Sequence, residues 1–143
     1  MNSPLLGLDV GFKRTGVALS ESGIIASPLT VLEADRPHMS RVIKEIIVLV
    51  RNHDIQTLVI GLPYTEDGEA TDQSNKVERF INDLRGTLAS EDLQPTLETV
   101  NEFYSSREAA ELYPDAPLDA AAAALILQEY INQQTWTWSK KYC

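Results

Sequence analysis

The sequence predicts a single α/β domain built on a mixed five-stranded sheet that is flanked by helices. Short apolar runs bounded by turn residues occur along the chain and are typical of buried strands. Beyond the first third they alternate with longer segments whose apolar residues recur every three or four positions, as in amphipathic helices. A length of 143 residues suits one domain. Strands joined by short turns pair antiparallel and strands joined through helices pair in parallel, so we expect antiparallel pairing among the first three strands.

The first predicted hairpin carries an acidic residue at a strand end. Residues 5–20 form an apolar run that ends in Asp9, turns, and becomes apolar again. A carboxylate near the end of a buried strand needs a partner, because a desolvated and unpaired charge is strongly destabilising. The partner can be a metal ion, the backbone amides of the turn at Gly11, or the side chain of Lys13 or Arg14. Alternatively, Asp9 does no more than cap the turn.

The middle of the chain predicts an edge strand, a helix and a buried strand. Residues 24–32 form a strand that Pro28 places at an edge or makes irregular. Apolar residues at three- and four-residue steps predict an amphipathic helix over residues 37–52. Residues 57–60 are short and apolar, as in a buried strand. The acidic loop over residues 64–72 then occupies a position where open α/β sheets bind ligands.

The C-terminal half predicts three helices around one further strand. The first helix has a core face made of Val77, Phe80, Ile81, Leu84 and Leu88. Residues 96–100 form the fifth strand, and Ser105 with Glu108 forms a capping box that starts the next helix. The last helix begins near Pro117, a residue favoured in the first turn, and runs through Gln133.

The composition is that of an ordinary globular domain, with 43% hydrophobic and 23% charged residues. We assign residues 1–134 to one domain and residues 135–143 to a C-terminal tail. No apolar run approaches the roughly 20 residues of a membrane span and no signal-peptide pattern opens the chain, so we expect a cytoplasmic protein. The single cysteine, Cys143, excludes an internal disulfide framework and a cysteine metal cluster.

The charge balance argues against non-specific binding of nucleic acid. Twelve basic residues against 21 acidic ones give a net charge of −9. Non-specific binding depends on a positive field that neutralises phosphates. A nucleic-acid function in this chain must therefore depend on a local basic patch and on metal ions.

Three acids at the ends of predicted elements can converge on one cleft. Asp9 ends the first strand, Glu102 follows the fifth strand, and Asp119 lies in the first turn of the last helix. Neighbouring carboxylates repel one another unless divalent cations neutralise them, and a ligand set made of oxygen alone suits Mg²⁺ or Mn²⁺. Two such ions about 4 Å apart can activate a water and stabilise the leaving oxygen of a phosphodiester. Taken alone, Asp119 is also explained by its favourable place at a helix N-terminus.

Three segments carry a resemblance to a known family. They are residues 7–18 (GLDVGFKRTGVA), residues 59–63 (VIGLP) and residues 118–128 (LDAAAAALILQ). Together they resemble the YqgF/RuvX family of the ribonuclease H-like superfamily, and the likeness extends over nearly the whole chain. The resemblance implies a ribonuclease H-like fold.

The resemblance also implies a metal-dependent endonuclease. By it, Asp9, Glu102 and Asp119 are the catalytic acids of a two-metal Mg²⁺ or Mn²⁺ site. Lys13 and Arg14 are implied to contact the nucleic-acid backbone. Members of the family are regarded as endonucleases that process the 5′ end of precursor 16S ribosomal RNA in ribosome biogenesis, and were earlier proposed as Holliday junction resolvases. The implied partners are structured RNA in a pre-ribosomal particle or branched DNA, bound by a monomer or a homodimer.

One motif departs from the family pattern. The usual Asp-Glu-Arg is replaced here by Asn101, Glu102 and Phe103. The missing arginine removes a bidentate clamp for phosphate or carboxylate that phenylalanine cannot replace. Arg107, one helical turn onward, is a candidate substitute that would contact nucleic acid.

The sequence leaves three classes of function open and does not distinguish RNA from DNA. The first is the metal-dependent nuclease. The second is a non-catalytic module that binds nucleic acid or the ribosome, favoured by Asn101, Phe103 and the net charge of −9. The third is an ATP-binding protein of the actin-like type, suggested by the turn over residues 9–16, although the chain lacks the second lobe and second phosphate loop of those proteins.

Overall fold

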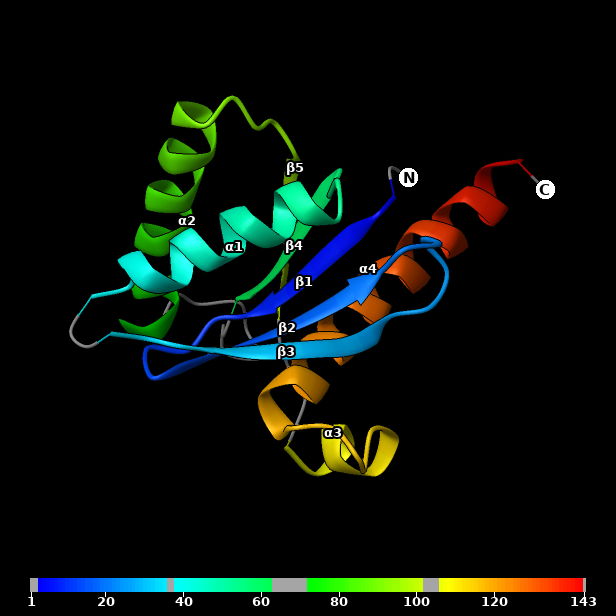
Figure 1. The fold of residues 1–143 in the computed structure, drawn as a ribbon. Helices are drawn as coiled ribbons and strands as arrows, with labels where there is room; N and C mark the ends of the chain where they lie inside the picture. Colours follow the sequence, from blue (N-terminus) through cyan, green and yellow to red (C-terminus); the bar gives the residue numbers. More distant parts are fainter. Residues whose placement is uncertain (1–2, 36–37, 63–71, 102–105, 143) are drawn as a thin grey trace.

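The computed structural model describes residues 3–35, 38–62, 72–101 and 106–142 (Figure 1). The elements are β1 (Leu5–Asp9), β2 (Arg14–Ser20), β3 (Ser27–Glu33), α1 (Ser40–Asn52), β4 (Thr57–Leu62), α2 (Asp72–Ser90), β5 (Thr96–Asn101), α3 (Ser106–Leu112) and α4 (Leu118–Tyr142). This order confirms the predicted succession of strands and helices. None of the helices in these ranges combines the length and the apolar character needed to span a bilayer.

The strands form one mixed sheet in the order β3-β2-β1-β4-β5. β2 pairs antiparallel with β1 and with β3, whereas β4 pairs in parallel with β1 and with β5. The predicted mixed five-stranded sheet with an antiparallel first half is confirmed. β3 is an edge strand with a register shift opposite Val17 and Ala18, as its Pro28 predicted.

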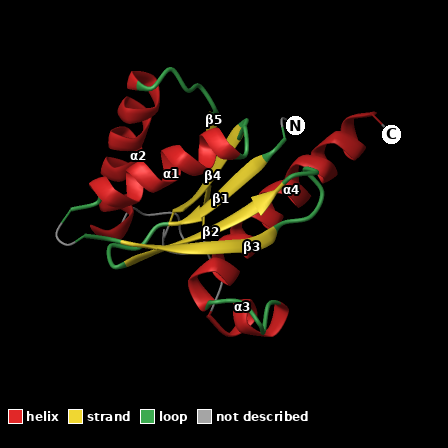
Figure 2. Cartoon of the chain, viewed as in Figure 1, coloured by secondary structure: helices red, strands yellow, loops and turns green. Residues whose placement is uncertain are grey.

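Helices cover both faces of the sheet, with α1 and α2 on one face and α4 on the other (Figure 2). Alternate residues of β1 divide between the two cores, because successive strand side chains point to opposite faces. Leu6 and Leu8 join the core under α1 and α2, and Leu5 joins the core under α4. The positions that predicted α1 and α2 are buried in the first core: Val42, Ile43, Ile46, Ile47, Val50, Val77, Phe80, Ile81, Leu84 and Leu88.

α4 lies close to the sheet because small residues meet at the contact. Ala123 and Ala124 are fully buried on the helix, and Gly7 lies beneath them in β1. A Cβ atom at Gly7 would lie 2.7 Å from the Cβ of Leu127 and 3.1 Å from the carbonyl oxygen of Ala123. At Gly7 the helix therefore packs directly onto the backbone of β1.

The third strand starts later than predicted. β3 begins at Ser27, and Ile24 and Ile25 lie before it, exposed, with backbone N–H groups that donate to the Ser22 hydroxyl. The side-chain amide of Gln128 in α4 binds this loop twice, donating to the Ile24 carbonyl at 3.0 Å and accepting from the Ala26 N–H at 2.9 Å. These polar contacts hold the loop in a turn where apolar character alone predicted a strand.

Helix boundaries also differ from the prediction. α1 begins at Ser40, and Pro37, where its start was predicted, lies outside the described residues, as does the predicted cap Ser105 of α3. α4 continues past the predicted end at Gln133 to Tyr142. The extension contains no glycine or proline, so the loss of a regular apolar pattern there does not end the helix.

Gly7→Ala is expected to lower the free energy of unfolding by about 1–3 kcal/mol, because the added methyl group overpacks the contact with α4. Urea denaturation measures the change. Gly86→Ala in α2 is the control, since nothing lies within 4 Å of its Cβ position, and it should stabilise by up to about 1 kcal/mol. Equal stability of the Gly7 variant and the natural chain would contradict the close packing.

Candidate active site

Asp9 ends the central strand on the face that α4 covers. Leu5 and Gly7 point to α4, and the alternation of the strand puts Asp9 on the same side. The residue is half-buried and takes part in an electrostatic or hydrogen-bonding contact. The predicted place of Asp9 at the end of a core strand is therefore correct.

Gly16 in β2 brings the first turn of α4 against Asp9. Gly16 is the antiparallel partner of Asp9 in the sheet, where opposite Cα atoms lie about 4.5–5.5 Å apart. A Cβ atom at Gly16 would collide with the backbone carbonyl of Asp119. Only a glycine leaves room for this approach, so the backbones of Asp9 and Asp119 both adjoin the same residue.

An ion pair closes this side of the site. The Arg14 Nε atom donates to Oδ2 of Asp119 at 3.1 Å, and the two side chains are 58% and 37% exposed. Arg14 precedes Gly16 by two residues in β2, so both face α4. A pair this exposed contributes about 0–1 kcal/mol to stability. The guanidinium of Arg14 thus balances the charge of the Asp119 carboxylate, but this ion pair holds the carboxylate only weakly.

The turn between β1 and β2 is held by hydrogen bonds to its backbone carbonyls and by a close backbone approach at Gly11. The hydroxyl of buried Thr15 donates to the Gly11 carbonyl at 3.2 Å, and a Cβ atom at Gly11 would collide with the Arg14 carbonyl. The carbonyl of Lys13 accepts a hydrogen bond from the Ala34 N–H at 2.9 Å. The turn therefore presents the exposed side chains of Lys13 and Arg14 from a defined backbone.

The third predicted acid, Glu102, lies outside the described residues, as does Phe103. β5 ends at Asn101, which is exposed and pairs with Leu62 at the end of β4. β4 separates β5 from β1, so the ends of β1 and β5 lie on the same edge of the sheet, about 10 Å apart. Convergence of Glu102 with Asp9 and Asp119 remains a prediction. Within the described ranges, no three His, Cys, Asp or Glu side chains form a metal-binding group.

The two acidic residues next to Gly16 have oxygen donors, which suit a hard divalent cation. Asp9 and Asp119 offer carboxylate oxygens, which Mg²⁺ and Mn²⁺ prefer as ligands. Gly16 allows the two residues to approach without an intervening side chain. The pair has the donor chemistry that a Mg²⁺ or Mn²⁺ site requires, and the site itself remains a prediction.

Two further basic residues have contacts that the structure describes, one in α3 and one in α2. Arg107 of α3 pairs with Glu111 at 3.1 Å and is 88% exposed. The sequence did not point to Lys76, whose Nζ atom lies 5.9 Å from the centre of the Phe12 ring in the β1–β2 turn. This cation–π contact joins residues far apart in sequence, and the apolar pattern that predicted α2 gave no signal for it.

Two tyrosines, one just before α4 and one within it, have raised pKa values. Burial raises the pKa of the Tyr113 hydroxyl. Burial, and then the Glu98 carboxylate, raise the pKa of the Tyr130 hydroxyl. Both phenols are therefore protonated at neutral pH.

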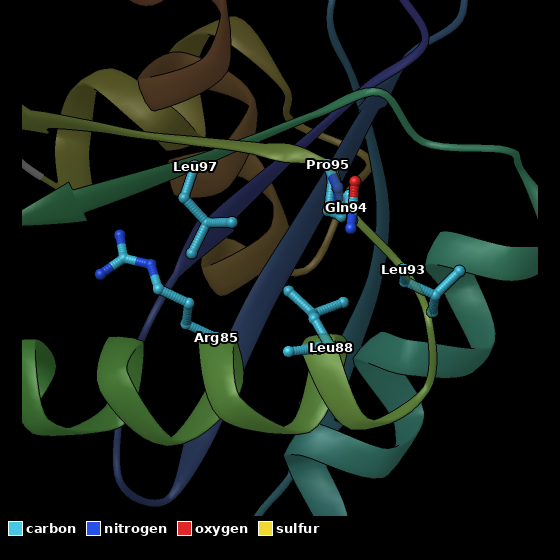
Figure 3. A pocket seen from close by; sticks show the side chains of 7 residues that line it. Arg85, Leu88, Leu93, Gln94, Pro95 and Leu97 are labelled. Atoms are coloured by element: carbon cyan, nitrogen blue, oxygen red, sulfur yellow. The ribbon is translucent and has the colours of Figure 1, made fainter.

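A pocket of about 290 Å³ lies beside the start of β5 (Figure 3). Leu97 of β5 faces Arg85 and Leu88 of α2 across it. Since β5 ends at Asn101, this pocket is at the opposite end of the strand from the candidate site. It contains none of the predicted catalytic residues and is not the candidate site.

Comparisons with known proteins agree with this fold. The model of the family described as RuvX, Holliday junction resolvase, matches residues 3–133. A protein of Gloeothece citriformis named "Putative pre-16S rRNA nuclease" is 37% identical over 90% of this chain and 87% of its own length. Proteins of the same name from Crocosphaera subtropica and Roseiflexus sp. are 36% and 32% identical, and the matches cover 92% and 94% of their lengths and 90% and 91% of this chain.

Solved structures with low sequence identity share the architecture. RuvC of Thermus thermophilus, in complex with a Holliday junction substrate, superposes with a TM-score of 0.63 at 11% identity, covering 93% of this chain and 96% of RuvC. The yeast mitochondrial Holliday junction resolvase Ydc2 gives a TM-score of 0.58 at 14% identity, covering 93% and 79%. The predicted ribonuclease H-like fold is confirmed.

Gly16→Ala is expected to lower the free energy of unfolding by about 1–3 kcal/mol or more, because the added methyl group collides with the Asp119 backbone. The loss should exceed that of Gly7→Ala, where the nearest atom, the Cβ of Leu127, is 2.7 Å from the added Cβ and the nearest backbone atom is 3.1 Å away, because the clash at Gly16 is closer and is with backbone. Urea denaturation of both variants side by side measures the difference. A Gly16 variant as stable as the natural chain would show that α4 does not rest on this residue.

Proposed function

Since this chain belongs to the RuvX family, we propose that it hydrolyses phosphodiester bonds with divalent metal ions held by Asp9, Glu102 and Asp119. The observation that carries the proposal is the contact between Gly16 and the Asp119 backbone, directly across from Asp9. It brings the backbones of two acids that are far apart in the sequence to the same glycine. Carboxylates that converge from such positions would favour a cation between them.

Each proposed residue has a defined task. Asp9 and Asp119 would hold Mg²⁺ or Mn²⁺ from β1 and α4. Glu102 follows the last residue of β5 in the sequence and is proposed as the third ligand. Bound ions at such a site supply an activated water and stabilisation of the leaving oxygen. Lys13, Arg14 and Arg107 would contact phosphates, which a chain of net charge −9 must bind through local cations.

We propose precursor 16S ribosomal RNA as the substrate, cleaved near its 5′ end during ribosome biogenesis. The support is the name of the relatives that are 32–37% identical over about nine-tenths of this chain. Branched DNA is the second candidate, favoured by the description of the matching family. A cleavage assay with precursor ribosomal RNA and a four-way DNA junction side by side, with and without Mn²⁺, distinguishes the two substrates.

Asn101 favours one further candidate, a module that binds nucleic acid without cutting it. Asn101 is exposed at the end of β5, where the family motif has an acid. Without that carboxylate, the end of β5 offers less negative charge for holding metal. Binding of both substrates with no cleavage in Mg²⁺ or Mn²⁺ would favour this candidate over the nuclease.

Asp9→Asn and Asp119→Asn are each expected to lower the cleavage rate at least about 100-fold, because either change removes a carboxylate that would hold metal charge at the reacting phosphate. Asp115→Asn is the matched control, since it removes an exposed acid shortly before α4 and should leave the rate unchanged. Cleavage rates measured in Mn²⁺ test all three. Full activity of both acid variants would refute the nuclease assignment of these residues.

Phe103→Arg is expected to raise the cleavage rate about ten-fold, because it restores a charged hydrogen-bond donor to the family motif. Arg107→Gln tests whether α3 provides the substitute cation and should then lower the rate. An unchanged rate in the Phe103 variant would discard the idea that the missing arginine limits activity.

A further inference from the structure

Arg14 is bound to the carboxylate that the proposed function assigns to metal. Its Nε atom donates to Oδ2 of Asp119 at 3.1 Å. We propose that Arg14 exchanges partners, neutralising Asp119 in the metal-free protein and moving to a substrate phosphate when Asp119 binds metal. The proposal rests on the proposed function, because it takes Asp119 as a metal ligand and nucleic acid as the substrate.

The partner exchange follows from charge. A guanidinium is always protonated, so Arg14 cannot lose its charge to make room for a cation. A divalent ion on Asp119 would repel the guanidinium that lies 3.1 Å from the same carboxylate. Arg14 and metal therefore compete for Asp119, and occupancy by one weakens binding of the other.

The structure also indicates that Arg14, and not Asp119, is the residue that moves. The backbone of Asp119 is pressed against Gly16 and cannot retreat into the sheet. The side chain of Arg14 is 58% exposed and its ion pair with Asp119 is open to solvent, so it can rotate into solvent. A guanidinium fork binds phosphate oxygens in pairs, which makes a phosphodiester beside the site a suitable second partner.

This exchange couples metal binding to nucleic-acid binding. Nucleic acid that draws Arg14 away from Asp119 removes the competitor of the metal, and metal that releases Arg14 provides a free cation for phosphate. Each ligand must then raise the affinity of the other by the same factor. Without nucleic acid, the contact of Arg14 with Asp119 lowers the affinity of the protein for metal.

Calorimetric titration with Mn²⁺ in the absence of nucleic acid tests the competition. Arg14→Gln is expected to bind Mn²⁺ about two- to five-fold more tightly than the natural chain, the upper part of the range that an exposed ion pair gives. Arg14→Lys keeps the charge and should stay close to the natural affinity. Arg41→Gln is the control, because Arg41 pairs with Glu45 at 3.5 Å with exposures of 60% and 37%, nearly those of Arg14 and Asp119.

Fluorescence anisotropy with a labelled four-way junction and a structured RNA tests the coupling. Measurements in Ca²⁺, which has similar oxygen ligands, and in chelator give the factor by which the ion strengthens nucleic-acid binding. The factor should be larger in the natural chain than in Arg14→Gln, and unchanged in Arg41→Gln. Gel analysis of the same samples confirms that the probes stay intact.

The outcomes separate this proposal from the proposed function. If Asp119→Asn abolishes Mn²⁺ binding while Arg14→Gln binds Mn²⁺ like the natural chain, the partner exchange is wrong and the metal site stands. If Arg41→Gln tightens Mn²⁺ binding as much as Arg14→Gln, the effect is one of net charge and the partner exchange is again overturned. If the natural chain and Asp119→Asn both fail to bind Mn²⁺, the metal site and the exchange fall together.

Discussion

The contact between the first turn of α4 and Gly16 is the constraint on which the candidate site depends. It puts the Asp119 backbone against the strand that pairs with β1, and so beside Asp9. The fully buried alanines farther along α4 keep the helix at this short distance from the sheet. The backbones of two acids that are far apart in the sequence thus come close together because Gly16, between them on β2, has no side chain.

The sequence was sufficient to predict the sheet and most of the core, because apolar spacing reports directly on which face of a strand or helix is buried. It also predicted the place of Asp9. It could not predict the pairing of Arg14 with Asp119 or the contact of Lys76 with Phe12, since both join side chains that only the folded chain brings together. The joint site of three acids remains a prediction, because Glu102 lies outside the described residues.

The errors at element ends have local physical causes. Ile24 and Ile25 are apolar enough for a strand, but hydrogen bonds from the loop to Ser22 and Gln128 hold them in a turn. The spacing of apolar residues carries no information about such polar contacts, and here these contacts decide where the strand begins. α4 shows the converse, since a helix without glycine or proline can continue to Tyr142 after its apolar pattern has ended.

The two glycine contacts also fix the rotational setting of α4. Gly16 meets Asp119 at the start of the helix, and Gly7 meets Ala123 and Leu127 one and two turns later, so all three helix residues lie on one stripe. Inserting or deleting a single residue between these contacts would turn the two ends of α4 by about 100° relative to each other. A change of length within this stretch of α4 would therefore be costly in this chain, even with every acid kept.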